Sequence, residues 1–144
     1  MAATATYDDT RLILQLYEMR REERMRKARA WFVASFRPKT LDEFGALCPP
    51  GSDENASYRM VTTYWEMVSS FMTAGVLNQE LFFQSGRELL LVWERMRDIL
   101  PALREKNTDA FQYSNLETVA KAYAAYLDRR SPGTYAAFAA RQRG

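Results

Sequence analysis

The chain has 144 residues, 47% of them apolar and 26% charged, with a formal net charge of +2, so residues 1–144 can form a single globular domain rather than a disordered chain. With no histidine and one cysteine, Cys48, it excludes an intramolecular disulfide, Ser-His-Asp and Cys-His nucleophilic sites, and zinc sites that need histidine or several cysteines. We therefore expect a chain that is not an enzyme and that holds no catalytic residue, cofactor or metal.

The sequence also predicts a location. No apolar run approaches the roughly 18–20 residues that a bilayer-spanning helix needs. The first nine residues lack the basic start and the apolar stretch of a secretion signal. We expect a cytoplasmic protein without an integral membrane segment, in which residues 1–7 form a flexible N-terminus.

The first expected element is a long helix from about Asp8 to Phe36. Asp8 and Asp9 can accept hydrogen bonds from the free backbone N–H groups of a helix start, and neither Gly nor Pro occurs before Pro38. Residues 20–29 are charged almost all round, so the middle of this helix cannot be fully buried. We expect the helix either to bend over the body of the protein or to project past it.

The first helix concentrates positive charge. Residues 11–39 contain nine Arg and Lys residues and three Glu residues, a net charge of +6 against +2 for the whole chain. A basic surface of this kind can bind the phosphates of nucleic acid or of anionic lipid. Its candidate members are Arg20, Arg21, Arg24, Arg26, Lys27 and Arg29. The alternative is an ordinary solvated helix face, because Glu22 and Arg26 are spaced to interact along the helix.

Two further main helices are expected in the middle of the chain. A Thr-Leu-Asp-Glu capping box at residues 40–43 opens a short helix before them. A longer helix is predicted at residues 55–74, with Gly75 in the place of a C-terminal cap. Another is predicted at residues 78–100, with a bend at residues 85–86. We expect these two helices to form an antiparallel hairpin across Gly75.

The last part of the chain is predicted to hold one main helix and one short one. Ser-Asn-Leu-Glu at residues 114–117 is a capping box that starts a helix running to about Arg129. A Ser-Pro-Gly break follows, and residues 134–141 can form a short helix within a C-terminal appendage at residues 131–144. No segment shows the sustained alternation of a strand. The predicted fold is therefore all-α, a bundle of four main helices with additional short helices.

Two glutamates follow tryptophans on helices that are expected to face the core: Glu66 follows Trp65, and Glu94 follows Trp93. A close pair of carboxylates can act as general acid and base or can bind a divalent metal. The alternative is that each carboxylate pairs with an arginine, because buried charges must be paired.

Tyr135 and Phe138 in the C-terminal appendage are a further candidate surface. They are expected on the apolar side of the short helix, where aromatic side chains can dock on the same domain or on a neighbouring molecule. Docking on a neighbour would make them the association surface of a homodimer.

The order of several motifs is similar to that of a known family. These motifs are Leu-Asp-Glu-Phe at 41–44, Tyr-Trp-Glu at 64–66, Gly-Val-Leu-Asn at 75–78, Val-Trp-Glu-Arg-Met-Arg-Asp-Ile-Leu-Pro-Ala-Leu-Arg at 92–104 and Phe-Gln-Tyr-Ser-Asn-Leu-Glu-Thr-Val-Ala at 111–120. Over residues 10–127 the chain resembles an uncharacterised bacterial family of small all-helical domains of unknown function. The resemblance implies an all-α fold and a bacterial source. Its motifs are helix-packing signatures, so it implies no active site.

Three hypotheses of function follow. The leading one is a non-enzymatic helical interaction or scaffold module that binds a protein partner or a second copy of itself, because the usual catalytic groups are missing and the long first helix is partly unburied. The first alternative is peripheral binding of nucleic acid or anionic membrane through the basic first helix. The second alternative is an enzyme or small-ligand binder that uses Glu66 and Glu94.

Overall fold

The computed structural model describes residues 3–143, and within them the chain forms nine α-helices and no strand. The helices are α1 (Tyr7–Arg20), α2 (Glu23–Ser35), α3 (Leu41–Leu47), α4 (Asp53–Thr73), α5 (Gln79–Phe83), α6 (Arg87–Met96), α7 (Leu100–Lys106), α8 (Ser114–Arg130) and α9 (Thr134–Arg143). The predicted all-α fold is confirmed. No helix within residues 3–143 combines the length and apolarity that crossing a bilayer requires.

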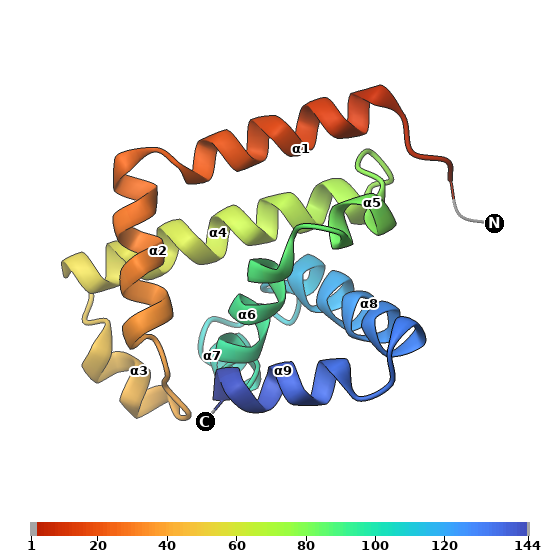
Figure 1. Ribbon diagram of the computed structural model, residues 1–144. Helices are drawn as coiled ribbons and strands as arrows, with labels where there is room; N and C mark the ends of the chain where they lie inside the picture. Colours follow the sequence, from red (N-terminus) through yellow and green to blue (C-terminus); the bar gives the residue numbers. More distant parts are fainter. Residues whose placement is uncertain (1–2, 144) are drawn as a thin grey trace.

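The longest helix, α4, lies at the centre of the molecule, and α2 and α8 pack against it (Figure 1). The side chain of Ser52 caps its start by accepting a hydrogen bond from the Asn55 N–H at 3.0 Å. Gly75, with a φ of 79°, allows the left-handed turn that follows its end. One hydrophobic core contains buried residues from all the described helices, and Trp65 of α4 is 1% exposed within it.

The predicted first helix is two helices, α1 and α2, which meet in a sharp turn after Arg20 (Figure 1). The Glu22 carboxylate caps the start of α2 by accepting a hydrogen bond from the Met25 N–H at 3.0 Å. The Arg29 side chain donates to the Arg20 carbonyl at 3.2 Å and so holds the end of α1. Because of this turn, α2 packs across α4 with Phe32 buried. One continuous helix was the wrong prediction, although the chain does bend over the body.

The helix predicted at residues 78–100 is likewise divided, into α5, α6 and the beginning of α7. The first break falls at Gly86, where an added Cβ would lie 2.1 Å from the buried Phe82 ring. A larger residue there would displace that ring from the core. The main neighbours of α4 are α2 and α8 rather than α5 and α6. The predicted antiparallel hairpin across Gly75 is therefore wrong.

Helix α8 has nearly the predicted bounds, but its predicted capping box is not formed. Tyr113 occupies the N-cap position with φ 58° and ψ 27°, and it makes no side-chain capping bond. The carboxylate of Glu117, the expected capping acid, accepts hydrogen bonds from Arg104 at 2.9 Å and from Lys121 at 2.8 Å. The carboxylate that a capping box would use is thus bound by Arg104 of α7 and by Lys121 within α8 itself.

Both terminal segments contact the body of the protein. Of residues 1–7, which were expected to be flexible, residues 1–2 lie outside the described part of the chain. The Ala3 carbonyl accepts a hydrogen bond from the Asn78 side chain at 2.8 Å, so the following residues are not the free end that the sequence predicted. At the other end, α9 packs on α6 and α8.

Candidate interaction surface

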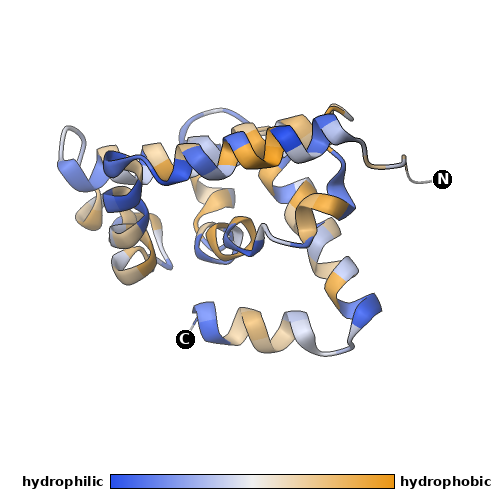
Figure 2. Cartoon of the chain, turned by 45° about the horizontal axis from the view of Figure 1, so that its top comes forward, coloured by the Kyte–Doolittle hydropathy of each residue, from blue (hydrophilic) through white to orange (hydrophobic). Residues whose placement is uncertain are grey.

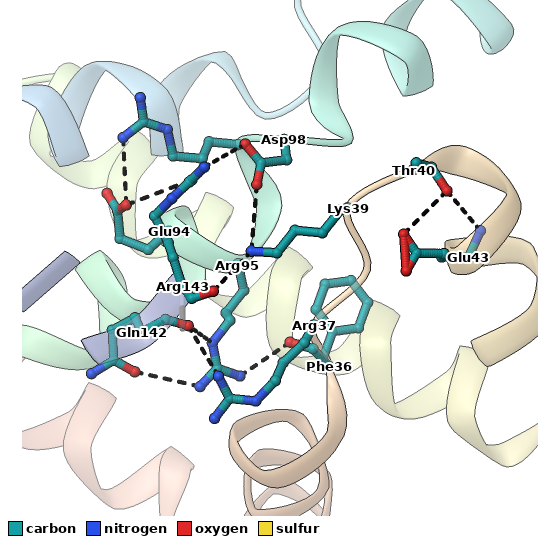
Figure 3. A network of polar contacts seen from close by, with 11 residues as sticks. Phe36, Arg37, Lys39, Thr40, Glu43, Glu94, Arg95, Asp98, Gln142 and Arg143 are labelled. Atoms are coloured by element: carbon teal, nitrogen blue, oxygen red, sulfur yellow. Dashed lines mark hydrogen bonds and ion pairs between the residues drawn. The ribbon is translucent and has the colours of Figure 1, made fainter. Parts of the chain in front are cut away.

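Glu94, the first member of the predicted carboxylate pair, lies on α6 with a fully buried side chain (Figure 3). The Tyr135 hydroxyl donates a hydrogen bond to its carboxylate. The Nη1 atoms of Arg97 and Arg143 lie 3.4 and 3.9 Å from its Oε1. Burial, together with this carboxylate, raises the pKa of Tyr135 to about 12, so the hydroxyl keeps its proton as the donor. Glu94 thus joins α6 to α9.

Glu66 of α4 has different partners. Its Oε1 accepts from the Leu116 N–H at 2.8 Å, and its Oε2 accepts from the Asn115 side chain at 2.8 Å. The carboxylate therefore caps the first turn of α8, where free N–H groups and the helix dipole favour a negative charge. Within residues 3–143, Glu66 and Glu94 have no hydrogen-bonding partner in common, so the structure does not support the alternative in which they form one site. Within residues 3–143 no group of three or more metal-ligand residues is assembled.

Glu88 of α6 forms ion pairs with two of the six basic residues that were predicted as one surface, Arg20 and Arg29. The Arg29 Nε lies 2.9 Å from its Oε2, and the Arg20 Nη1 lies 3.7 Å from the same oxygen. The Trp65 Nε1 also donates to this carboxylate, at 3.2 Å. The hydrogen bond to Glu88 raises the pKa of the Arg29 guanidinium. Arg20 and Arg29 are therefore partly buried ion-pair partners and not members of an unpaired basic surface.

The remaining basic residues, Arg21, Arg24, Arg26 and Lys27, are exposed. Lys27 pairs with Glu23 at 3.2 Å, an exposed pair of the kind that contributes little to stability. The basic surface is thus smaller than predicted. The spacing of residues within the first helix could not indicate the pairing with Glu88, because Glu88 lies 59 positions from Arg29 in the chain.

The predicted association surface faces the interior of its own chain. Phe138 is 5% exposed, and the Arg87 guanidinium lies 5.5 Å from the centre of its ring. Tyr135 is half-buried, and its hydroxyl also accepts a hydrogen bond from Arg97 at 3.1 Å. The two aromatic residues dock α9 on the body, which was one of the two predicted possibilities. They are therefore not an exposed surface for a homodimer.

Arg95 is a buried cation that the sequence did not indicate (Figure 3). Its Nη1 donates to the carbonyl groups of Phe32, Val33 and Phe36 at 3.0–3.2 Å, and its Nε donates to the Gln142 carbonyl at 2.9 Å. The guanidinium thus caps the end of α2 and holds the end of α9. Burial, with a smaller effect of Arg37, lowers its pKa to about 10.

An apolar groove lies between α1 and α4, and we call it the methionine groove. Two hollows of about 560 and 620 Å³ form it, and they share Met19 and Met67. Its lining residues are Leu12, Gln15, Leu16, Glu18, Met19, Glu22, Met25, Met60, Thr63, Tyr64, Met67 and Phe71. Methionine is common on surfaces that adapt to a partner, because its unbranched thioether side chain can take many shapes.

Several apolar side chains along α1 and the methionine groove are open to solvent. Met19 is 51% exposed, Met60 of α4 is 38% exposed, and Leu14 on the outer side of α1 is 67% exposed. Figure 2 shows hydrophobic segments along α1 among hydrophilic ones. The charged side chains that line the groove are Glu18 and Glu22. The groove is therefore apolar with an acidic edge.

No curated protein and no solved structure matches the chain. A family model matches residues 5–123, which include both sides of the methionine groove and leave α9 outside the match. The predicted kinship with a family of unknown function is thereby confirmed, whereas the bacterial source stays a prediction. With most of its length matched, the chain belongs to the family described as a domain of unknown function (DUF4760).

Proposed function

We propose that this chain is a non-enzymatic helical interaction module that binds a basic amphipathic helix of a protein partner in the methionine groove. The observation that carries the proposal is the combination of exposed methionines and an acidic edge between α1 and α4. The proposal keeps the cytoplasmic location and the bacterial source that the sequence predicts.

The course of the groove favours a helix as its occupant. Residues 19–25 of the first hollow face residues 60–67 of α4, and residues 12–19 of the second hollow face residues 67–71. The groove therefore follows both helices over several turns and suits an elongated ligand. An amphipathic helix, with apolar residues three or four positions apart, is the usual occupant of such a groove.

The charged residues of the groove favour a basic partner. Glu18 lies on α1 and Glu22 lies at the start of α2, and both line the groove, so both carboxylates lie beside a helix bound there. Lys or Arg residues beside the apolar stripe of the partner would pair with them, whereas an acidic helix would be repelled. An anionic membrane surface would be repelled by the same glutamates, which favours a protein partner for this groove.

The proposal can be tested with two synthetic amphipathic helices that share one leucine stripe and differ in having Lys or Glu on the polar face. We expect the Lys peptide to bind with one-to-one stoichiometry in calorimetry and the Glu peptide to bind at least tenfold more weakly. A Met67→Lys variant should weaken binding of the Lys peptide at least tenfold, because it places a cation in the apolar floor. Added salt should weaken the complex.

Val76 supplies the matched control, because it is 66% exposed on the turn after α4 and does not line the groove. Val76→Lys should bind the Lys peptide like the wild type. Equal binding by the Met67→Lys variant, or no binding of the Lys peptide, would refute the proposal. Light scattering adds a further outcome: a dimer that Met67→Lys converts into a monomer would make the occupant a second copy of the chain.

A second candidate function is binding of nucleic acid or anionic lipid through the exposed basic residues. Arg21, Arg24 and Arg26 support it, since they are exposed and form no ion pair within residues 3–143. Such binding must weaken steeply with salt. Absence of binding to duplex DNA, RNA and anionic vesicles at low ionic strength would remove this candidate.

A further inference from the structure

A second recess, on another part of α4, has a chemical character quite different from that of the methionine groove. It is a cleft of about 420 Å³ that lies between α3, the first half of α4, α7 and the segment before α8. Its wall combines aromatic and apolar side chains with basic and amide side chains. No Asp or Glu side chain lines it within the described part of the chain.

The aromatic part of the wall is held in place by a chain of hydroxyl groups. The Thr62 hydroxyl donates to the Tyr58 carbonyl at 2.9 Å, so its oxygen accepts the hydrogen bond that joins it to the Tyr113 hydroxyl at 2.8 Å. The Tyr113 oxygen in turn accepts from the Tyr58 hydroxyl at 3.2 Å. Each hydroxyl proton has an assigned acceptor, so both tyrosine rings are fixed before any ligand arrives.

The backbone around Tyr113 is also specialised. Tyr113 has φ 58° and Thr108 has φ 52°, in the left-handed region that bulky or branched residues rarely adopt. The strained conformation at Tyr113 places its ring in the wall of the cleft, next to Tyr58. Strain of this kind persists where the surrounding structure enforces it, and it is most common at binding sites and active sites.

The polar part of the wall carries positive charge without a counter-charge. Arg59 and Lys106 line the cleft, and neither forms an ion pair within residues 3–143. The Arg59 Nε donates to the Asn55 side chain at 2.9 Å, which orients the guanidinium and leaves its Nη groups for a ligand. Two cations beside fixed aromatic rings match an anionic group attached to a flat apolar body.

We propose that the cleft between α3, α4 and α7 binds a small molecule that carries a carboxylate or phosphate group on an aromatic body. The aromatic body lies against Tyr58, Tyr113 and Phe44, and the anionic group lies on Arg59 and Lys106. Binding in this cleft does not rest on the proposed partner helix, although Thr63 lines both the cleft and the methionine groove.

Calorimetry with 2-naphthoate, 2-naphthyl phosphate, 2-naphthol and inorganic phosphate tests the proposal. At least one of the two naphthyl anions should bind at least tenfold more tightly than 2-naphthol and than inorganic phosphate. The tighter of 2-naphthoate and 2-naphthyl phosphate shows whether the cleft prefers a carboxylate or a phosphate. A double variant, Arg59→Gln with Lys106→Gln, should weaken that binding at least tenfold. Arg24→Gln with Lys27→Gln removes the same charge from α2 and should leave it unchanged.

Gly45 allows a test that separates binding from folding. It lies in the wall of the cleft, and an added Cβ there would meet no atom within 4 Å. Gly45→Ala should keep the fold and raise its Tm by a few degrees, because alanine favours the helix. Gly45→Trp should keep the fold, as circular dichroism would show, and abolish naphthyl binding by filling the cleft. Binding retained in a folded Gly45→Trp variant, or naphthol binding as tightly as both anions, would overturn the proposal.

Discussion

The two terminal helices are held to the same body in different ways. α9 buries the Phe138 ring in the core and adds contacts of Tyr135 with Glu94 and of Gln142 with Arg95. α1 has four more residues than α9, and its buried residues are Asp9 and Leu16, of which Leu16 alone is apolar.

α1 is attached by Leu16, which is buried near its middle, and by polar contacts near its two ends. At its beginning, the Asp9 carboxylate accepts a hydrogen bond from the Asn78 N–H at 2.7 Å, and at its end Arg20 pairs with Glu88. A helix held in this way keeps its position although other apolar side chains, such as Leu14 and Met19, stay exposed. The difference between α9 and α1 thus explains why α1, and not α9, borders an open apolar groove.

The strongest test of this comparison is Arg95→Ala, which removes the anchor of α9. Four backbone carbonyls would lose a donor inside the protein, and we expect the free energy of unfolding to fall by about 3 kcal/mol. Urea unfolding followed by circular dichroism would measure the loss. Arg129→Ala is the matched control, because Arg129 is exposed on α8. A loss below about 1 kcal/mol, the size expected for an exposed arginine, would mean that Arg95 is not an anchor of α9.

A smaller effect is expected for Glu88→Gln, which keeps the shape of the side chain and removes its charge. Arg20 and Arg29 would remain partly buried without their partner, so we expect a loss of about 2 kcal/mol in the free energy of unfolding. In hydrogen exchange, the amides of α1 should lose the most protection. Glu23→Gln breaks the exposed pair with Lys27 and should cost about 0.5 kcal/mol or less. Equal losses in the two variants would contradict the assignment of Glu88 as the anchor of α1.

The smallest effect concerns Asp9 and appears as a dependence on pH. Hydrogen bonds from the Thr6 and Asn78 backbone N–H groups hold the pKa of Asp9 below its ordinary value of 3.8. Its contribution to stability is therefore complete above about pH 5 and is lost as the pH falls through the lowered folded-state pKa. Asp9→Asn should reduce the Tm by a few degrees at neutral pH and should flatten the fall in Tm below about pH 5. Glu80→Gln, at an exposed position of α5, should leave the acid-induced fall as it is in the wild type.

The sequence was sufficient for those parts of the fold that local signals control. The Thr-x-x-Glu motif at residues 40–43 does cap α3, and Gly75 does end the turn after α4. The sequence was not sufficient to predict the turn between α1 and α2. No glycine or proline marks this turn, and its capping residue, Glu22, lies inside a charged run. The single helix predicted from Asp8 to Phe36 was therefore too long.

The candidate surfaces were harder to predict because their outcome depends on contacts between distant positions. The sequence indicates Arg20 and Arg29 as surface cations, whereas in the structure Glu88 of α6 pairs with both. Glu94 was correctly expected to be buried with arginine partners as one alternative, whereas nothing near Arg95 in sequence indicates that it binds the carbonyls at the end of α2. The methionine groove was missed because α1 has apolar residues on several sides, and spacing alone did not tell which of them the body covers.

The capping of α8 by Glu66 has a consequence for the order of folding. The first turn of a helix is its costly nucleus, since several residues are fixed before the backbone bonds repay them. Here the Leu116 N–H in that turn is bonded by a side chain 50 positions earlier in the chain. We therefore expect the start of α8 to become stable only after α4 has docked, so the amides around Leu116 should gain protection late in refolding, together with the α4–α8 contact.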